Sequence, residues 1–171
     1  MKLKSHLKLF FRQNYGNEYA AKVLYGTILL FVALLGLNAS GISSGYLAST
    51  EVFIALVAII IAEDYAELIG FTIKNKRVLN KRERHEIFED TFAITTFCLP
   101  PVIILLFSES GLYDLNTAFI ISYIYCVSIL FVFSYYANIL SNYSRLRSFV
   151  TAAAIACTGL MIVILKYSFG K

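Results

Sequence analysis

The sequence predicts an all-α polytopic membrane protein with five transmembrane helices, its N-terminus in the cytoplasm and its C-terminus outside. Of the 171 residues, 58% are hydrophobic and only 15% are charged, and the mean hydropathy is +0.70. This composition is far more apolar than one water-soluble core requires. Five apolar stretches are each long enough to cross about 30 Å of hydrocarbon as a helix. They cover residues 20–39, 52–73, 91–107, 115–138 and 148–167.

The distribution of basic residues predicts the topology. Thirteen of the 15 Lys and Arg residues lie at the N-terminal side of the first stretch, between the second and third, or between the fourth and fifth. Loops 40–51 and 108–114 contain none. Because Lys and Arg accumulate in cytoplasmic loops, we expect a multi-pass protein of the inner, or cytoplasmic, membrane. The net charge of +4 follows from this asymmetry and gives no indication of nucleic-acid binding.

Residues 1–19 predict a short amphipathic helix at the membrane surface. One face carries apolar residues and another carries basic ones: Leu3, Leu7, Phe10 and Phe11 against Lys4, Lys8 and Arg12. Such a segment lies flat on the inner leaflet, with its cations near anionic lipid headgroups. The first span follows at residues 20–39. A cleaved secretory leader is the alternative, but Leu37-Asn38-Ala39 is a poor cleavage sequence.

Three carboxylates interrupt the second span, at Glu63, Asp64 and Glu67. Counting at 1.5 Å per residue from both ends of residues 52–73 places Glu63 and Asp64 close to the midplane, with Glu67 one turn nearer the cytoplasm. An ionised carboxylate at that depth costs at least about 2.5 kcal/mol, so we expect all three to face the interior of the bundle. The sequence shows no Lys or Arg within a span at that depth to balance them.

These carboxylates allow more than one chemistry. They can take up protons, bind a cation, or hydrogen-bond to hydroxyl groups and water. Stacked carboxylates that exchange a proton for a metal ion are typical of a cation transporter, because hard divalent cations favour oxygen ligands. A polar cluster that fixes helix packing is the structural alternative.

The segment at about residues 76–90 predicts a charged cytoplasmic helix that leads into the third span. Its alternating charges favour ion pairing along a solvated helix surface. His85 and Glu89 are four residues apart, so they share a face and form a weaker candidate site for a divalent ion.

Pro100 and Pro101 lie near the middle of the third span. Two prolines remove two backbone donors, so we expect the helix to bend or break there. The freed carbonyl groups then need partners from Thr95, Thr96 or a neighbouring helix. Broken helices can shape a transport path, but membrane helices also carry kinks that have no such function.

The last two spans predict helix packing. Tyrosines near the end of the fourth span are typical of an interfacial belt. Small residues in the fifth span allow close helix approach within the chain or in a homodimer. Cys98, Cys126 and Cys157 fall inside spans, where small helix-contact side chains are a better interpretation than a soft-metal site.

Several segments resemble known proteins. The segments YGTILLFVALL, YAELIG and LRSFVTAAAIACTGLMIVILK, together with the proline pair, resemble a group of small bacterial five-span membrane proteins. More distantly, the five-span plan resembles the vacuolar iron transporter family of dimeric, proton-coupled exporters of divalent ions. Tyr25-Gly26 is similar to the opening of that family's first span, and Asp64-Tyr65, or Glu63 in a shifted register, to its acidic-aromatic pair.

The sequence departs from that family in two places. Leu29 occupies the position of a metal-binding Asp, and the family's large cytoplasmic metal-binding insertion is reduced to the short charged segment. The resemblance implies a transport path shaped by Tyr25, Gly26, Pro100 and Pro101.

Two functions therefore follow from the sequence. The first is transport of a divalent cation or of protons, with Glu63, Asp64 and Glu67 as ligands or proton carriers. The second is a non-transporting membrane subunit or scaffold whose buried acids stabilise helix packing. No nucleophile with a base, phosphate-binding Gly loop or complete His-containing metal motif is present, so we expect neither an enzyme nor a resident cofactor beyond a transported cation.

Overall fold

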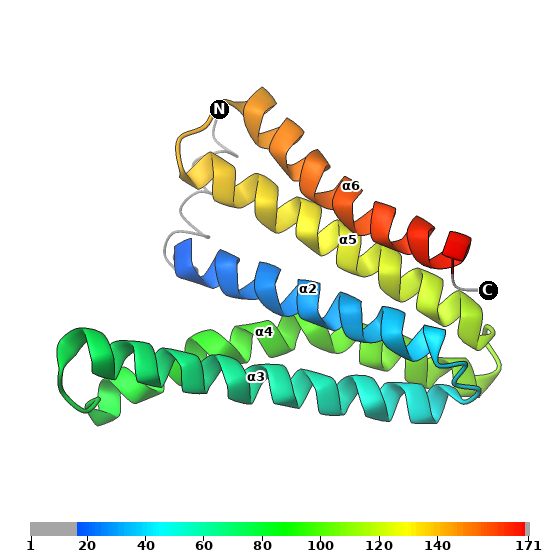
Figure 1. Cartoon of the computed structure of the whole chain (residues 1–171), viewed down its shortest axis with the longest axis horizontal. Coiled ribbons are helices and arrows are strands. Elements are labelled where there is room, and N and C mark those ends of the chain that lie inside the picture. Colours follow the sequence, from blue (N-terminus) through cyan, green and yellow to red (C-terminus); the bar gives the residue numbers. More distant parts are fainter. Residues whose placement is uncertain (1–16, 170–171) are drawn as a thin grey trace.

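A computed structural model describes residues 17–169, apart from the side chains of residues 17–19, 86, 89–93, 162, 165–167 and 169. The predicted surface segment 1–19 therefore falls outside the described residues, except for the backbone of its last three. The described chain is entirely helical, which confirms the all-α fold class (Figure 1). Its elements are α2 (Asn17–Ala39), α3 (Gly45–Asn75), α4 (Lys81–Phe107), the 3-10 turn η1 (Ser108–Ser110), α5 (Leu115–Leu140) and α6 (Arg145–Phe169).

Three of these helices, α2, α3 and α5, are long and apolar enough to cross a membrane. The described apolar segment Ile94–Ser110, which combines the last part of α4 with η1, is shorter. With 31 residues, α3 is about 46 Å long and exceeds the hydrocarbon thickness of a bilayer. These lengths support a multi-pass helical membrane protein. The five-span count and the orientation stay predictions.

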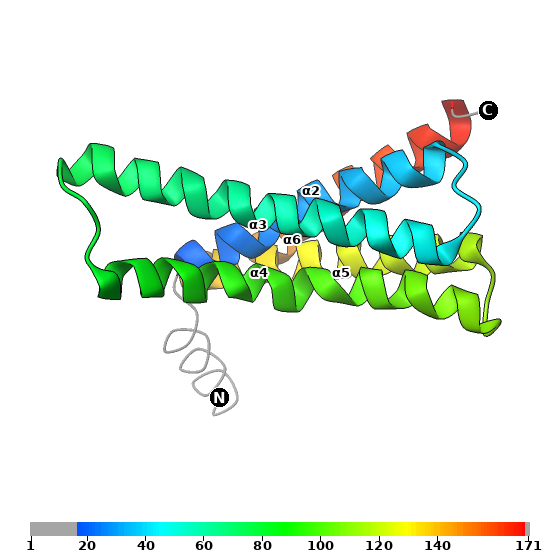
Figure 2. The same ribbon diagram turned by 90° about the horizontal axis from the view of Figure 1, so that it is seen from below.

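The helices form an antiparallel bundle in which α2 packs against α3, α4 and α5, while α6 packs mainly on α5. Buried residues from four helices form the main core, including Leu34, Leu56, Ile94 and Phe119. We call the end where α2 begins and α3 meets α4 the basic end. There the α3–α4 hairpin projects beyond the start of α2 (Figures 1 and 2).

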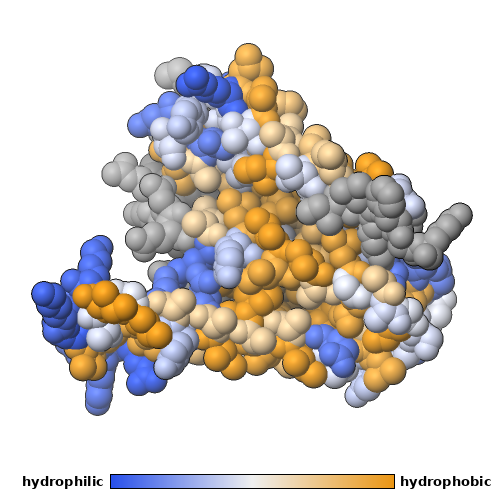
Figure 3. Space-filling model, in the orientation of Figure 1, coloured by the Kyte–Doolittle hydropathy of each residue, from blue (hydrophilic) through white to orange (hydrophobic). Residues whose placement is uncertain are grey.

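The outer surface of the bundle is strongly apolar. Large hydrophobic side chains are more than half exposed along its length, including Ile54, Ile61, Ile124 and Ile164. Figure 3 shows apolar residues across the middle of this face, while hydrophilic residues gather at the α3–α4 turn and near the α5–α6 turn. Soluble monomers rarely expose such a continuous apolar surface, so this pattern fits contact with lipid.

Polar contacts fix both ends of the α3–α4 hairpin. At the basic end, Asn80 and Glu83 form a capping box that starts α4, and Arg77 Nη2 lies 2.6 Å from Glu83 Oε1. The Arg77 guanidinium, together with the Asn80 N–H, lowers the pKa of Glu83 to about 2. At the other end, Glu109 Oε1 accepts hydrogen bonds from Ser44 Oγ at 2.8 Å and from the Tyr46 N–H at 3.0 Å. The end of α4 therefore lies beside the start of α3.

The sequence predicted that the helix bends or breaks at the prolines, and the structure shows that it does not break. α4 continues from Lys81 to Phe107 with Pro100 and Pro101 inside it. Since Pro101 has no N–H, the carbonyl of Phe97 loses its usual partner four residues later. The hydroxyl of Tyr125 on α5 donates to that carbonyl at 3.0 Å. A neighbouring helix therefore supplies the missing donor, which was one of the options expected from the sequence.

Candidate functional site

Three acidic residues of α3, Glu63, Asp64 and Glu67, are half-buried, and they face two different neighbours. Glu67 faces α2, where its Oε1 lies 2.6 Å from Lys22 Nζ. The side chain of Lys22 is 7% exposed and that of Glu67 is 29% exposed. Asp64 instead lines a cavity against α4. The two carboxylates therefore face different helices, Glu67 toward α2 and Asp64 toward α4.

The expectation that no cation balances these acids was also wrong. Lys22 is two residues inside the candidate span 20–39, and it pairs with Glu67 across the α2–α3 contact. Because α2 and α3 run antiparallel, the start of α2 lies beside the last part of α3. The sequence places Lys22 only among the cytoplasmic flanking charges.

The ion pair places Glu67 level with Lys22, near the start of α2 and toward the basic end. Glu63 lies one helical turn, about 6 Å, farther from that end. The position of these residues relative to the bilayer midplane stays a prediction. The midplane estimate began counting at Val52, whereas α3 already begins at Gly45.

Glu63 lies close enough to interact electrostatically with Glu67, Lys22 and Asp64. Glu67 Oε2 is buried and has no hydrogen-bond partner among the described residues. One lysine therefore faces two carboxylates on this side of α3. Such a site holds a charge pair together with a second carboxylate that can be protonated or ionised.

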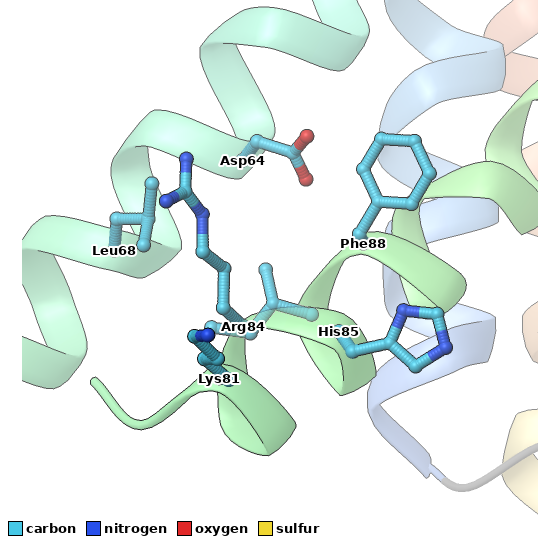
Figure 4. A pocket seen from close by; sticks show the side chains of 7 residues that line it. Asp64, Leu68, Lys81, Arg84, His85 and Phe88 are labelled. Carbon is cyan, nitrogen blue, oxygen red and sulfur yellow. The ribbon is translucent and has the colours of Figure 1, made fainter.

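A cavity of about 450 Å³ opens between α3 and α4 near the basic end, and Asp64 lines it (Figure 4). Its lining combines apolar and charged residues: Asp64, Leu68, Lys81, Arg84, His85, Ile87 and Phe88. Asp64 Oδ1 is buried, and the described part of the chain offers it no hydrogen-bond partner.

Figure 4 shows how these side chains lie. The carboxylate of Asp64 projects from α3 into the space between the helices, and Arg84 extends its guanidinium from α4 toward Asp64 and Leu68. The ring of His85 points away from Asp64. The cavity therefore presents an acidic group on one wall and basic groups on the other.

No group of three or more His, Cys, Asp or Glu side chains within the described residues is arranged to hold a metal ion. His85 lines the cavity, but the side chain of Glu89 lies outside the described residues, so their pairing stays a prediction. Cys98 and Cys126 are buried and Cys157 is exposed.

The four residues expected to shape a transport path lie at or near helix contacts. Gly26 faces α4, where an added Cβ would lie 2.5 Å from Ile94 Cγ2. Tyr25 is 51% exposed, so its side chain is not enclosed within the bundle. Pro101 is buried and Pro100 is half-buried in α4. Sequence analysis did not identify Lys22 or Arg84 as site residues, because both belong to ordinary basic flanks.

No protein-family model, curated protein or solved structure matches this chain. The resemblances to five-span membrane proteins and to the vacuolar iron transporter family therefore stay predictions.

Proposed function

We propose that this protein is a five-span membrane subunit or scaffold that does not itself transport ions, and that the acidic residues of α3 fix the packing of its helices. The observation that carries this proposal is the ion pair between Lys22 and Glu67. This pair joins two candidate spans, α2 and α3. Glu67 thus faces α2, whereas Asp64 lines the cavity beside α4.

The hairpin geometry supports the five-span part of the proposal. The α3–α4 turn is short, and Glu109 at the end of α4 bonds to Ser44 and Tyr46 at the start of α3. The two helices therefore run side by side in opposite directions over most of their length, which favours a path for α4 across the membrane beside α3. α6 returns along α5 in the same way (Figure 1).

The physical role of the ion pair is specificity of packing. Removing two charges from water costs several kcal/mol per ion, and their attraction repays this only in good geometry. A buried pair therefore adds little net stability compared with apolar residues of similar size. Any packing that separates Lys22 from Glu67 loses their attraction, so the pair disfavours other registers of α2 against α3.

Transport of a divalent cation or of protons is the second candidate. It is favoured by two buried carboxylate oxygens, Asp64 Oδ1 and Glu67 Oε2, that have no hydrogen-bond partner in the described part of the chain. Half-buried Glu63 directly precedes Asp64 and interacts electrostatically with both Asp64 and Glu67. These groups could accept protons or contact a passing cation.

A double-mutant cycle tests the scaffold role. We expect Lys22→Met or Glu67→Gln alone to lower the free energy of unfolding in detergent by about 3 kcal/mol, because each removes the ion pair between α2 and α3 while the other group stays desolvated. The double variant should recover most of this loss. Glu51→Gln, an exposed acid on the same helix, is the matched control and should stay within about 0.5 kcal/mol of the wild type.

Flux measurements distinguish the two candidates. In proteoliposomes that contain the purified protein, the scaffold proposal predicts no protein-dependent movement of protons, Fe²⁺, Mn²⁺ or Zn²⁺. Flux that Glu63→Gln or Asp64→Asn abolishes in folded protein would instead establish transport. Additive losses in the Lys22 and Glu67 cycle would overturn the scaffold role of the pair.

A further inference from the structure

The cavity between α3 and α4 offers binding groups of both charges near the basic end of the bundle. We propose that it binds the phosphoethanolamine headgroup of a phospholipid. This inference rests on the membrane placement in the proposed function, but it is independent of the Lys22–Glu67 pair.

The basic wall of the cavity suits a phosphate group. Lys81 and Arg84 both come from the first turn of α4, and both have exposed side chains that line the cavity. A guanidinium presents paired N–H donors that match phosphate oxygens, while a lysine ammonium supplies a point charge. Basic pockets between membrane helices on the cytoplasmic side are typical binding sites for lipid phosphates.

The acidic wall requires a cation from the same ligand. Asp64 Oδ1 is buried without a hydrogen-bond partner among the described residues, and a buried acceptor left unpaired is costly. A simple anion would leave this oxygen unpaired and would be repelled by it. A simple cation would face Lys81 and Arg84. A phosphate that carries a primary ammonium group satisfies both walls, because its N–H groups can donate to Asp64 Oδ1.

The composition and size of the cavity fit a lipid headgroup. Leu68, Ile87 and Phe88 add apolar lining beside its charged groups. A volume of about 450 Å³ also lies within the ordinary range for small-molecule sites.

Lipid competition on the full-length purified protein tests the proposal. Native mass spectrometry would compare phosphatidylethanolamine, phosphatidylcholine and phosphatidylglycerol with identical acyl chains. We expect the wild type to prefer phosphatidylethanolamine about tenfold over phosphatidylcholine, whose quaternary ammonium has no N–H to donate. Asp64→Asn should remove this preference, and Arg84→Gln should weaken binding of both lipids.

Controls separate the possible sources of the ligand. Glu51→Gln should keep the wild-type lipid preference. If Asp64→Asn fails to fold, Arg84→Gln still tests the proposal, because Arg84 is exposed and its substitution should not disturb folding. Soluble phosphoethanolamine should compete only weakly, because it lacks acyl chains. Its binding in place of the lipid would overturn the lipid assignment. Equal binding of phosphatidylcholine, or stronger binding of phosphatidylglycerol, would overturn the headgroup proposal even if the Lys22–Glu67 cycle behaves as expected.

Discussion

At the scale of single residues, Gly26 and Gly36 occupy the same helix in different surroundings. An added Cβ at Gly26 would lie 2.5 Å from Ile94 Cγ2. An added Cβ at Gly36 would have no neighbouring atom within 4 Å. Gly26 therefore allows α2 to approach α4 closely, as small residues do between membrane helices.

Alanine substitutions at these two glycines test this role. We expect Gly26→Ala to lower the free energy of unfolding by about 1–3 kcal/mol, because the new methyl overpacks the α2–α4 contact. Gly36→Ala should instead leave stability unchanged or raise it by up to about 1 kcal/mol, because alanine favours the helix. Thermal and denaturant unfolding in detergent would measure both. Combining Gly26→Ala with Ile94→Ala should cost less than the sum of the separate changes, and strict additivity would argue against the contact.

The sequence predicted the acidic residues of the candidate site but not their partners. Charged side chains inside an apolar stretch are visible in a one-dimensional pattern, so Glu63, Asp64 and Glu67 could be selected. Lys22 could not, because it lies at the edge of its span, where basic residues are ordinary. The pairing with Glu67 depends on how far α3 extends past the start of α2. The rotation of about 100° between successive helix residues likewise turns Asp64 toward α4, which only the packing defines.

At the scale of helices, α4 shows how a neighbour can preserve a helix that contains two prolines. The Tyr125 hydroxyl on α5 takes the place of the N–H that Pro101 lacks, by donating to the Phe97 carbonyl. The sequence located the weak point and the need for a donor, but it favoured bending or breaking. Tyr125 lies 28 residues away in the chain, and only the α4–α5 packing brings its hydroxyl to that carbonyl.

A second double-mutant cycle tests this compensation. Tyr125→Phe should lower the free energy of unfolding by about 1 kcal/mol, because the Phe97 carbonyl loses its donor in an apolar environment. In a Pro101→Ala background, the alanine N–H can bond to that carbonyl, so the same change should cost much less. Tyr113→Phe is a matched control, since its hydroxyl also donates to a carbonyl of α4, that of Ile104, away from the prolines. An equal cost of Tyr125→Phe in both backgrounds would contradict the compensation.

At the scale of the whole molecule, charge and hydropathy are distributed as expected for a bundle that contacts lipid along its length and water at its ends. The described surface exposes large apolar side chains along the bundle, whereas basic residues concentrate in the α3–α4 and α5–α6 turns. Hydropathy patterns predicted the helical architecture well, because each span is a long local signal. They underestimated α3, whose helix starts before its most apolar residues and continues beyond them.

Labelling of single cysteines distinguishes five spans from three. If α2, α3, α4, α5 and α6 all cross, a cysteine at exposed Leu112 should react with a membrane-impermeant maleimide from outside, and one at Tyr143 only from the cytoplasm. If only α2, α3 and α5 cross, both positions change sides, because α4 no longer returns the chain. Ser43→Cys and Val78→Cys flank α3 and are controls with the same expected sides in either case, outside and cytoplasmic respectively. Because α4 runs the length of α3 and ends beside its start, we expect the five-span pattern. Labelling of Leu112→Cys from the cytoplasm would contradict it.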